Sequence, residues 1–186
     1  MRIVAGRFRG AALVAPKGSD IRPTSDRVRE SLFNILAHGI DGVRLEGARV
    51  LDLFAGTGAL GLEALSRGAA YVHFVEDDAD ARGLIRRNIE ALGATGVTRI
   101  YRRDATKLGD AGTLKPFDLV FADPPYGKGL AERALQSAVG GGWLLPAALA
   151  VVEESADAEF ALPPGFDLID QRVYGDTAIR FLRRTA

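Results

Sequence analysis

The sequence predicts an α/β domain built around a mostly parallel sheet. Short apolar runs of strand length alternate along the chain with segments of helical periodicity. One of the first runs passes directly into a glycine-rich loop and then a helix, and acidic residues stand where several runs end. At 186 residues, 47% hydrophobic and 26% charged, the chain is large enough for one domain with a sizeable core.

The N-terminal quarter is expected to form a short extension, residues 1–40, packed on a main domain of residues 41–186. Its second half predicts a helix that is N-capped by Ser25 or Thr24. Apolar side chains recur along that helix at a spacing that predicts one buried face. They are Val28, Leu32, Ile35 and Leu36.

The same extension carries an excess of positive charge. Residues 1–30 hold seven basic and three acidic side chains, whereas the whole chain is neutral. Arg2–Ala5 and Ala11–Val14 predict a β-hairpin, and the basic side chains around it suit a phosphate backbone. The alternative is a solvated surface without a partner. The candidate RNA contacts are Arg2, Arg7, Arg9, Arg22, Arg27 and Arg29.

The predicted strand Val50–Phe54 leads into a glycine loop, Ala55–Gly61, and then a helix. Gly56, Gly58 and Gly61 have the spacing G-x-G-x-x-G. Glycines let the backbone approach a ligand, and the start of a helix presents free N–H groups. The pattern predicts a nucleotide-like ligand but does not separate a dinucleotide from S-adenosylmethionine. A tight turn with close helix packing is the alternative.

Two further strands end in candidate ligand contacts. Tyr71–Val75 is followed by Glu76, about twenty positions after the first glycine, a placement that suits hydrogen bonds to ribose hydroxyls. Arg99–Arg103 is followed by Asp104, which suits either an adenine amino group or the cap of the next segment.

The tetrapeptide Asp123-Pro124-Pro125-Tyr126 follows the apolar strand Phe117–Ala122, where an open α/β sheet binds its ligands. An exocyclic amine on a nucleobase is a poor nucleophile because its lone pair is delocalised into the ring. Acceptors on both N–H groups, the Asp123 carboxylate and the Pro124 carbonyl, localise that lone pair. Tyr126 offers a face on which the base stacks. The motif predicts methylation of such an amine, and the alternative is a rigid turn.

The remaining elements complete the sheet. We expect a helix over Leu130–Val139, a strand over Ala148–Glu153, and a final pair of strands over Phe166–Asp170 and Ala178–Leu182.

Two sets of motifs carry a resemblance to known families. Leu51–Gly58 resembles the cofactor loop of Rossmann-like, class I S-adenosylmethionine-dependent methyltransferases, and the Asp123–Tyr126 motif resembles their amino-methylating motif. Met1–Gly10 and Ile21–Leu36 are similar to the opening of the RsmD family, bacterial 16S ribosomal RNA guanine-N2 methyltransferases. The resemblance implies a seven-stranded sheet with helices on both faces and a C-terminal antiparallel hairpin.

The resemblance also implies an activity, a cofactor and a partner. The activity is transfer of a methyl group from S-adenosylmethionine to N2 of one guanine in 16S ribosomal RNA, which leaves S-adenosylhomocysteine and needs no metal. The RNA is either free or part of an assembling or assembled small subunit, and the protein is expected to be a cytoplasmic monomer. The implied catalytic residues are Asp123, Pro124, Pro125 and Tyr126. The implied cofactor contacts are Asp52, Phe54, Gly56, Thr57, Gly58, Glu76, Asp104 and Ala105.

Other functions stay open from the residues alone. The same motif suits adenine N6 of DNA or RNA, or a side-chain amide of a protein. A non-enzymatic assembly factor would keep the fold and bind RNA, and a dinucleotide oxidoreductase would use the glycine loop but not the proline turn. The chain has no cysteine, which excludes disulfides, thiolate zinc sites and a cysteine nucleophile. It shows neither an apolar stretch of membrane-spanning length nor a signal peptide.

Overall fold

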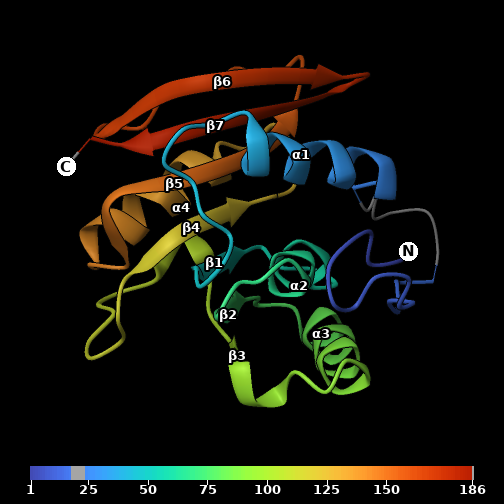
Figure 1. Ribbon diagram of the computed structural model, residues 1–186. Helices are drawn as coiled ribbons and strands as arrows, with labels where there is room; N and C mark the ends of the chain where they lie inside the picture. Colours follow the sequence, from blue (N-terminus) through green and yellow to red (C-terminus); the bar gives the residue numbers. More distant parts are fainter. Residues whose placement is uncertain (18–23, 186) are drawn as a thin grey trace.

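The computed structural model describes residues 1–17 and 24–185 (Figure 1). Its seven-stranded sheet has the order β3-β2-β1-β4-β5-β7-β6, and β7 runs antiparallel to both of its neighbours. The strands are β1 Arg49–Leu53, β2 Tyr71–Val75, β3 Thr98–Tyr101, β4 Phe117–Ala122, β5 Leu144–Ser155, β6 Phe166–Tyr174 and β7 Thr177–Arg184. The helices are α1 Asp26–His38, α2 Ala59–Ser66, α3 Ala79–Ala91 and α4 Leu130–Gly140, with short 3-10 turns η1 Thr95–Val97 and η2 Ala105–Lys107. The predicted fold class is confirmed.

Helices cover both faces of the sheet, as the alternation of side chains along β1 requires. Val50 belongs to the core shared with α1, α2 and α3, whereas its neighbour Leu51 belongs to the core shared with α4. Phe33 of α1 packs on Phe121 of β4, with ring centroids 5.6 Å apart. The N-terminal extension therefore contributes directly to the main core.

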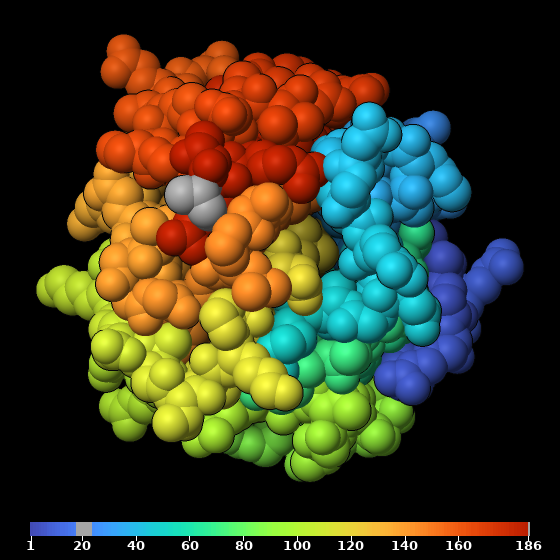
Figure 2. Space-filling model, turned by 60° about the vertical axis from the view of Figure 1, so that its left-hand side comes forward, coloured from blue at the N-terminus to red at the C-terminus, as the bar shows by residue number. Residues whose placement is uncertain are grey.

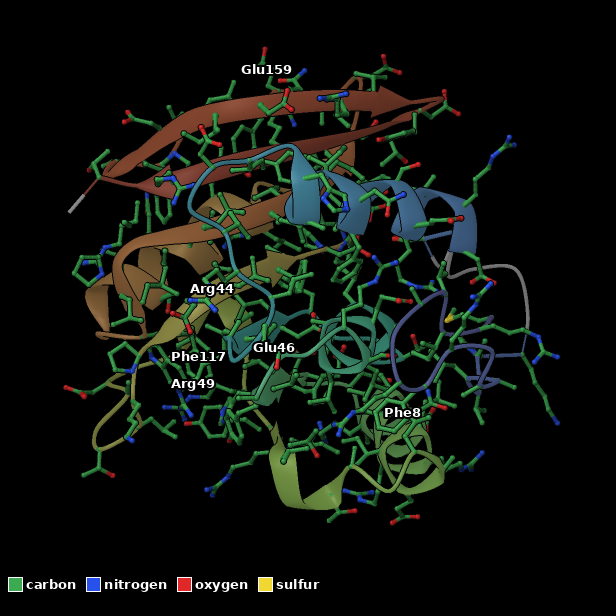
Figure 3. All side chains as sticks on the ribbon, in the orientation of Figure 1. Phe8, Arg44, Glu46, Arg49, Phe117 and Glu159 are labelled. Carbon is green, nitrogen blue, oxygen red and sulfur yellow. The ribbon has the colours of Figure 1, made fainter. Side chains whose placement is uncertain are left out.

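Aromatic rings surround His73 in the middle of β2. Tyr101 and Trp143 lie 5.6 and 5.7 Å from the imidazole, and burial lowers the pKa of His73 to about 4. At the edge of this group the Arg49 guanidinium lies over the Phe117 ring, 4.9 Å from its centroid (Figure 3). His73 is thus a neutral packing residue in the middle of its strand, and it does not line the large cleft at the carboxyl ends of the strands.

The end of the sheet opposite the candidate site carries a smaller hollow. Residues 42–44 and 145–149, cyan and orange in Figure 2, line a hollow there with a volume of about 290 Å³. Arg183 joins the two segments by donating hydrogen bonds to the carbonyls of Asp41 and Ala147. This surface lies at the amino ends of the parallel strands.

The structure differs from the predicted elements in several places, among them the end of β6, which runs to Tyr174 rather than to Asp170. The expected N-terminal hairpin forms only in part. Its two arms are joined by backbone hydrogen bonds from the Ile3 and Leu13 N–H groups to the Ala11 and Met1 carbonyls, with one bridge between Arg2 and Ala12. The Val4 and Ala5 N–H groups bond to Glu63 of α2 instead of extending the ladder. β3 ends at Tyr101 rather than at Arg103. β5 begins at Leu144 rather than Ala148, and Pro146, which donates no ladder hydrogen bond, hid its first part from sequence reasoning.

Candidate functional site

A cleft of about 1070 Å³ opens at the carboxyl ends of β1, β2 and β4. β1 and β4 are adjacent in the sheet although they are far apart in sequence, so the strand order reverses direction between them. Such a switch point is where open α/β sheets bind ligands. Predicted site residues on its wall are Asp52, Phe54, Gly56, Thr57, Glu76, Asp104, Ala105, Asp123, Pro124, Pro125 and Tyr126.

The Glu76 carboxylate fixes the glycine loop. Its Oε1 accepts a hydrogen bond from the Gly56 backbone N–H at 2.8 Å, and its Oε2 accepts one from the Asp78 N–H at 3.1 Å. Gly56 has a φ of +59°, which a glycine adopts without strain. Each carboxylate oxygen keeps a free lone pair, so Glu76 is pre-oriented to accept from ribose hydroxyls.

Asp52 of β1 holds the far end of the same loop through a hydrogen bond to its backbone. Its buried carboxyl accepts a hydrogen bond from the Gly61 N–H at 3.0 Å, and a Cβ at Gly61 would lie only 2.6 Å from the Phe74 ring. Burial raises the pKa of Asp52 to about 8, against the opposing effect of the Gly61 N–H. Asp52 therefore holds the start of α2 close to the sheet and stays largely protonated at neutral pH.

Two further loop residues have distinct roles. Phe54 lines the cleft and has a φ of 55°, which is a left-handed backbone conformation. This conformation costs free energy in a residue other than glycine, and residues that adopt it are concentrated at ligand sites. Gly58 is the predicted cofactor residue that is not on the cleft wall. It N-caps α2 with a φ of +81°, and a Cβ there would lie 3.3 Å from the Phe74 ring. Gly58 therefore serves close packing.

At the end of β3, Asp104 caps η2. Its Oδ1 accepts hydrogen bonds from the Thr106 N–H at 2.9 Å and from the Thr106 hydroxyl at 2.7 Å. These bonds lower the pKa of Asp104 below its usual range. Of the two interpretations of Asp104, the cap is the one that the contacts support. Ala105 is buried beside it on the cleft wall.

The Asp123–Tyr126 motif crosses the opposite wall of the cleft. The Tyr126 hydroxyl donates a hydrogen bond to Glu153 Oε1 at 2.7 Å, and the residue as a whole is 38% exposed. The Gly127 N–H donates to Glu154 Oε1 at 2.9 Å. Two neighbouring carboxylates at the end of β5 therefore hold the turn, and the face of Tyr126 remains open to a ligand.

Acidic groups gather around Asp123. Burial, followed by the charges of Glu153 and Asp52, holds the pKa of Asp123 well above its usual range. Burial and Glu153 also raise the pKa of Tyr126. Sequence reasoning missed Glu153, although it ends a predicted strand. Since the carboxyl ends of parallel strands share one edge, that placement was the available signal.

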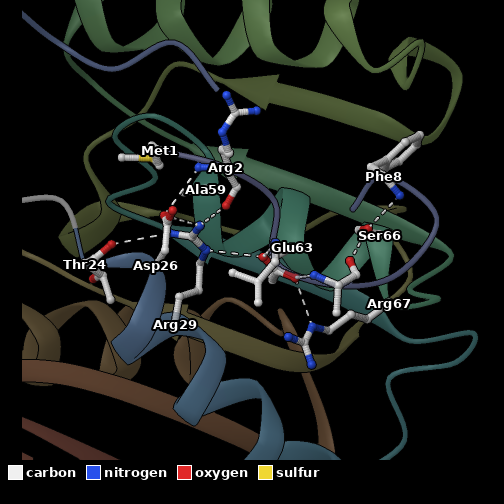
Figure 4. A network of polar contacts seen from close by, with 12 residues as sticks. Met1, Arg2, Phe8, Thr24, Asp26, Arg29, Ala59, Glu63, Ser66 and Arg67 are labelled. Carbon is white, nitrogen blue, oxygen red and sulfur yellow. Dashed lines mark hydrogen bonds and ion pairs between the residues drawn. The ribbon is translucent and has the colours of Figure 1, made fainter. Parts of the chain in front are cut away.

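A buried acid ties the N-terminal loop to α2 (Figure 4). The Glu63 carboxylate accepts hydrogen bonds from the Val4 and Ala5 N–H groups at 2.9 and 3.1 Å. It also pairs with Arg29 at 3.3 Å and with Arg67 at 3.0 Å. The contact is close at Gly6, where a Cβ would lie 2.0 Å from the Ser66 carbonyl oxygen.

The prediction that Arg29 contacts RNA is wrong. Its side chain is fully buried, and its guanidinium bonds to Glu63, to Asp26 and to the carbonyls of Arg2 and Thr24. An arginine placed on an apolar helix face at the right spacing is a structural anchor, because burial demands that every donor find a partner.

The other predicted RNA contacts remain on the surface where the structure describes them. Arg7, Arg9 and Arg27 are exposed, and exposed Arg2 donates to the Gly10 carbonyl at 2.8 Å. Arg22 lies outside the described residues. Three further basic side chains line the cleft on its other rim and were not predicted as RNA contacts. They are Arg103, Lys107 and Arg133.

Neither a metal site nor a membrane span is found in the described part of the chain. Residues 1–17 and 24–185 contain no group of three or more His, Asp or Glu side chains arranged to hold a metal ion. Within the same residues, no helix has the length and apolar character needed to cross a membrane.

Comparison with known proteins assigns the family. The family described as Conserved hypothetical protein 95 matches residues 1–183. Ribosomal RNA small subunit methyltransferase D of Escherichia coli (strain K12) is 39% identical over 188 residues, which cover all of this chain and 91% of that protein. The chain belongs to the RsmD family.

Solved structures agree with this RsmD-family membership. The Escherichia coli protein yhhF aligns with a TM-score of 0.84 and 37% identity, covering 100% of this chain and 98% of that one. An RNA methyltransferase from Salinibacter ruber, solved in complex with S-adenosyl-L-homocysteine, aligns with a TM-score of 0.65 over 88% of this chain and 94% of that one. At 14% identity, the second match shows the shared Rossmann-like fold alone.

Proposed function

We propose that this RsmD-family chain transfers a methyl group from S-adenosylmethionine to the exocyclic N2 of a guanine in 16S ribosomal RNA, with S-adenosylhomocysteine as the other product. Within this proposal the target is guanine 966 of 16S ribosomal RNA, the nucleotide position that the family resemblance implies. One observation carries the proposal. The Asp123–Tyr126 turn and the glycine loop with Glu76 open into the same cleft.

The residues of one half of the cleft fit the cofactor. The Glu76 carboxylate is already oriented by the Gly56 and Asp78 N–H groups and offers its free lone pairs to the ribose hydroxyls. Phe54 and Thr57 line the neighbouring wall, and Ala105 lies on the side where β3 ends. When bound, this cofactor supplies an electrophilic methyl group on a positively charged sulfonium.

The other half of the cleft acts on the amine. The Asp123 carboxylate accepts one N–H of the base, and the Pro124 carbonyl accepts the other, which localises the nitrogen lone pair toward the methyl carbon. The N–C bond forms as the C–S bond breaks, and the surplus amine proton leaves after transfer. Tyr126 stacks on the base, which must be unpaired or flipped out of its helix to enter.

The partner surface is proposed to include the exposed arginines of the N-terminal extension, residues 1–40, which docks on the methyltransferase domain, residues 41–186. Arg2, Arg7, Arg9 and Arg27 meet the RNA backbone in this proposal, and the RNA is either free or part of a small subunit. Ribosomal RNA as substrate implies action in the cytoplasm. We expect a monomer, which light scattering of the purified protein measures.

Mapping of methylated nucleosides tests the function. Ribosomal RNA from cells with and without the protein is digested and compared by mass spectrometry, and we expect N2-methylguanosine to be lost at one position. Loss of N6-methyladenosine instead would favour the adenine alternative. Unchanged methylation together with retained RNA binding would favour an assembly factor without enzymatic activity.

A further inference from the structure

Glu153 is a buried carboxylate that the proposed reaction leaves without a role. It is 6% exposed and is not part of the cleft wall. Since β4 and β5 are parallel with Ala122 opposite Val152, Glu153 lies beside Asp123 at the same edge of the sheet. Its two oxygens accept from different elements, Oε1 from the Tyr126 hydroxyl at 2.7 Å and Oε2 from the Thr24 hydroxyl at 2.6 Å.

The carboxyl groups of Asp123 and Glu153 have few hydrogen-bond donors between them. The Thr24 hydroxyl has one proton to donate, and it lies 2.6 Å from Glu153 but 3.4 Å from Asp123. Within the described residues neither carboxylate forms an ion pair. Ionising both of two adjacent buried carboxyl groups without a nearby cation costs a large free energy because the two charges repel each other. Such a pair therefore shares one proton.

The surrounding groups strengthen this effect. The carboxyl of Asp52 faces the pair from β1, and the Tyr126 phenol faces it from the motif itself. Arg29 of α1 lines the same cleft, but its charge is already matched by Glu63 and Asp26. Burial and the neighbouring Glu153 raise the pKa of Asp123, and Asp52 adds to this effect once it is itself ionised. A cation that enters the cleft therefore meets an uncompensated acidic pair.

We propose that Glu153 is a positioning residue that orients the Tyr126 ring and forms, with Asp123, a carboxyl pair that keeps one proton until a cationic ligand enters the cleft. This inference rests on the proposed function, because the sulfonium of the methyl donor is that cation. Its charge near the pair drives the proton to solvent, and Asp123 then carries the full negative charge that the amine N–H groups need. No redox step and no further reactant are required.

The first test compares two ligands that differ by one charge. S-adenosylmethionine carries the sulfonium, whereas S-adenosylhomocysteine has a neutral thioether. Calorimetric titrations at pH 7 in buffers of different ionisation enthalpy measure the protons exchanged on binding. We expect release of about one proton with S-adenosylmethionine and essentially none with S-adenosylhomocysteine. Equal proton release with both ligands would overturn the proposal.

Matched variants assign the effect to Glu153. Glu153→Gln keeps an acceptor for the Tyr126 hydroxyl but removes the carboxyl that shares the proton with Asp123, so the proton release should fall well below that of the wild type. Glu154→Gln makes the same charge change one residue away, at a side chain that accepts from the Gly127 and Ser155 N–H groups, and it should keep the release. Loss of the release in both variants, or in neither, would contradict the assignment.

A second measurement does not depend on the cofactor. Carbon-13 NMR of the aspartate carboxyls follows the ionisation of Asp123 in the free protein, and we expect it to move to lower pH in Glu153→Gln but not in Glu154→Gln. An unmoved titration would overturn the carboxyl pair even if methyl transfer were normal. If S-adenosylmethionine failed to bind while the NMR shift was present, the proposed function would fail and the carboxyl pair would stand.

Discussion

In both halves of the cleft a glutamate at the end of a strand accepts a hydrogen bond from the neighbouring loop, but the group that donates the bond differs. In the cofactor half, Glu76 at the end of β2 bonds to the backbone N–H of Gly56 in the loop after β1. In the motif half, Glu153 at the end of β5 bonds to the side-chain hydroxyl of Tyr126 in the loop after β4. Each carboxylate thus holds the loop that follows the neighbouring strand.

The difference lies in what is held. The glycine loop is fixed through the Gly56 backbone and leaves open space beside it, so it suits the binding of a ligand. The motif turn is fixed through the Tyr126 side chain as well as the Gly127 N–H, and it presents a carboxylate and an aromatic face at set angles, which suits the reacting group. Changes in the first half should therefore alter affinity for the cofactor, and changes in the second half should alter turnover or base binding.

The sharpest test of that division is Asp123→Ala. We expect turnover to fall by about a hundredfold or more, because one of the two acceptors for the amine is lost. Affinity for S-adenosylmethionine should stay close to that of the wild type. Single-turnover methylation and calorimetry measure the two quantities, and exposed Asp157→Ala is the control. Turnover within threefold of wild type would remove Asp123 from the mechanism.

Glu76→Ala tests the other half. Loss of a charged acceptor for the ribose should weaken S-adenosylmethionine binding by roughly 1.5–3 kcal/mol. The rate at saturating cofactor should change much less. Asp80→Ala, an exposed change four residues away on α3, controls for the altered charge. Unchanged affinity in a folded Glu76→Ala protein would contradict the ribose assignment, and tighter binding of NADH would overturn the choice of cofactor.

Tyr126 separates stacking from orientation within the motif half. Tyr126→Ala should lose about 1–3 kcal/mol of base binding. Tyr126→Phe keeps the face and loses only the hydrogen bonds of the hydroxyl to Glu153 and Thr177, so most activity should remain. Steady-state kinetics with an RNA substrate distinguish the two variants. Equal losses in both would mean that the hydroxyl, and not the ring face, is the important group.

Asp52 makes stability depend on pH. The folded protein holds its proton up to about pH 8, whereas an unfolded chain releases it near 3.8. The folded state thus binds more protons in between, and this group lowers the free energy of unfolding as pH rises, by about 1.4 kcal/mol per pH unit. Urea unfolding at pH 6 and 7 should show a shallower pH dependence in Asp52→Asn. An identical slope would mean that Asp52 is already ionised in the folded protein.

The smallest change in the rate of methyl transfer is expected from substitution of Arg7 and Arg9, which lie exposed on the N-terminal loop. Changing both to Glu should weaken RNA binding across sequences and flatten its dependence on salt, because fewer counterions are released. Turnover at saturating RNA should change little. Binding isotherms at several salt concentrations measure the slope. An unchanged slope would exclude the loop from the RNA surface.

The comparison of the two halves also explains what could be predicted. The glycine loop, Glu76 and the Asp123–Tyr126 motif are local patterns, because each lies within a few residues of a strand end. Glu153 and Thr24 act through contacts between segments more than a hundred residues apart, which no local pattern contains. The error at Arg29 has the same cause, since its partner Glu63 lies on another helix.

Strand positions were predicted well where apolar runs were continuous, as in β1, β2 and β4. They were predicted less well where the chain breaks a rule inside an element, as at Pro146 in β5. The N-terminal segment forms only a short hairpin for a further reason. The Ile3 and Leu13 N–H groups bond to the opposite arm, as predicted. The N–H groups between the arms, those of Val4, Ala5 and Phe8, bond instead to side chains of α2, which stops the ladder.

The close approach of Gly6 to α2 has a genetic consequence. Gly10 has a similar φ of +83° but nothing within 4 Å, so a methyl group there would cost only backbone strain, whereas at Gly6 it would also collide with the Ser66 carbonyl. A Gly6→Ala allele should lift the arginine-bearing loop off its support while Glu76 and Asp123 keep their places. Such an allele would separate substrate docking from chemistry in living cells, through the addition of one carbon atom.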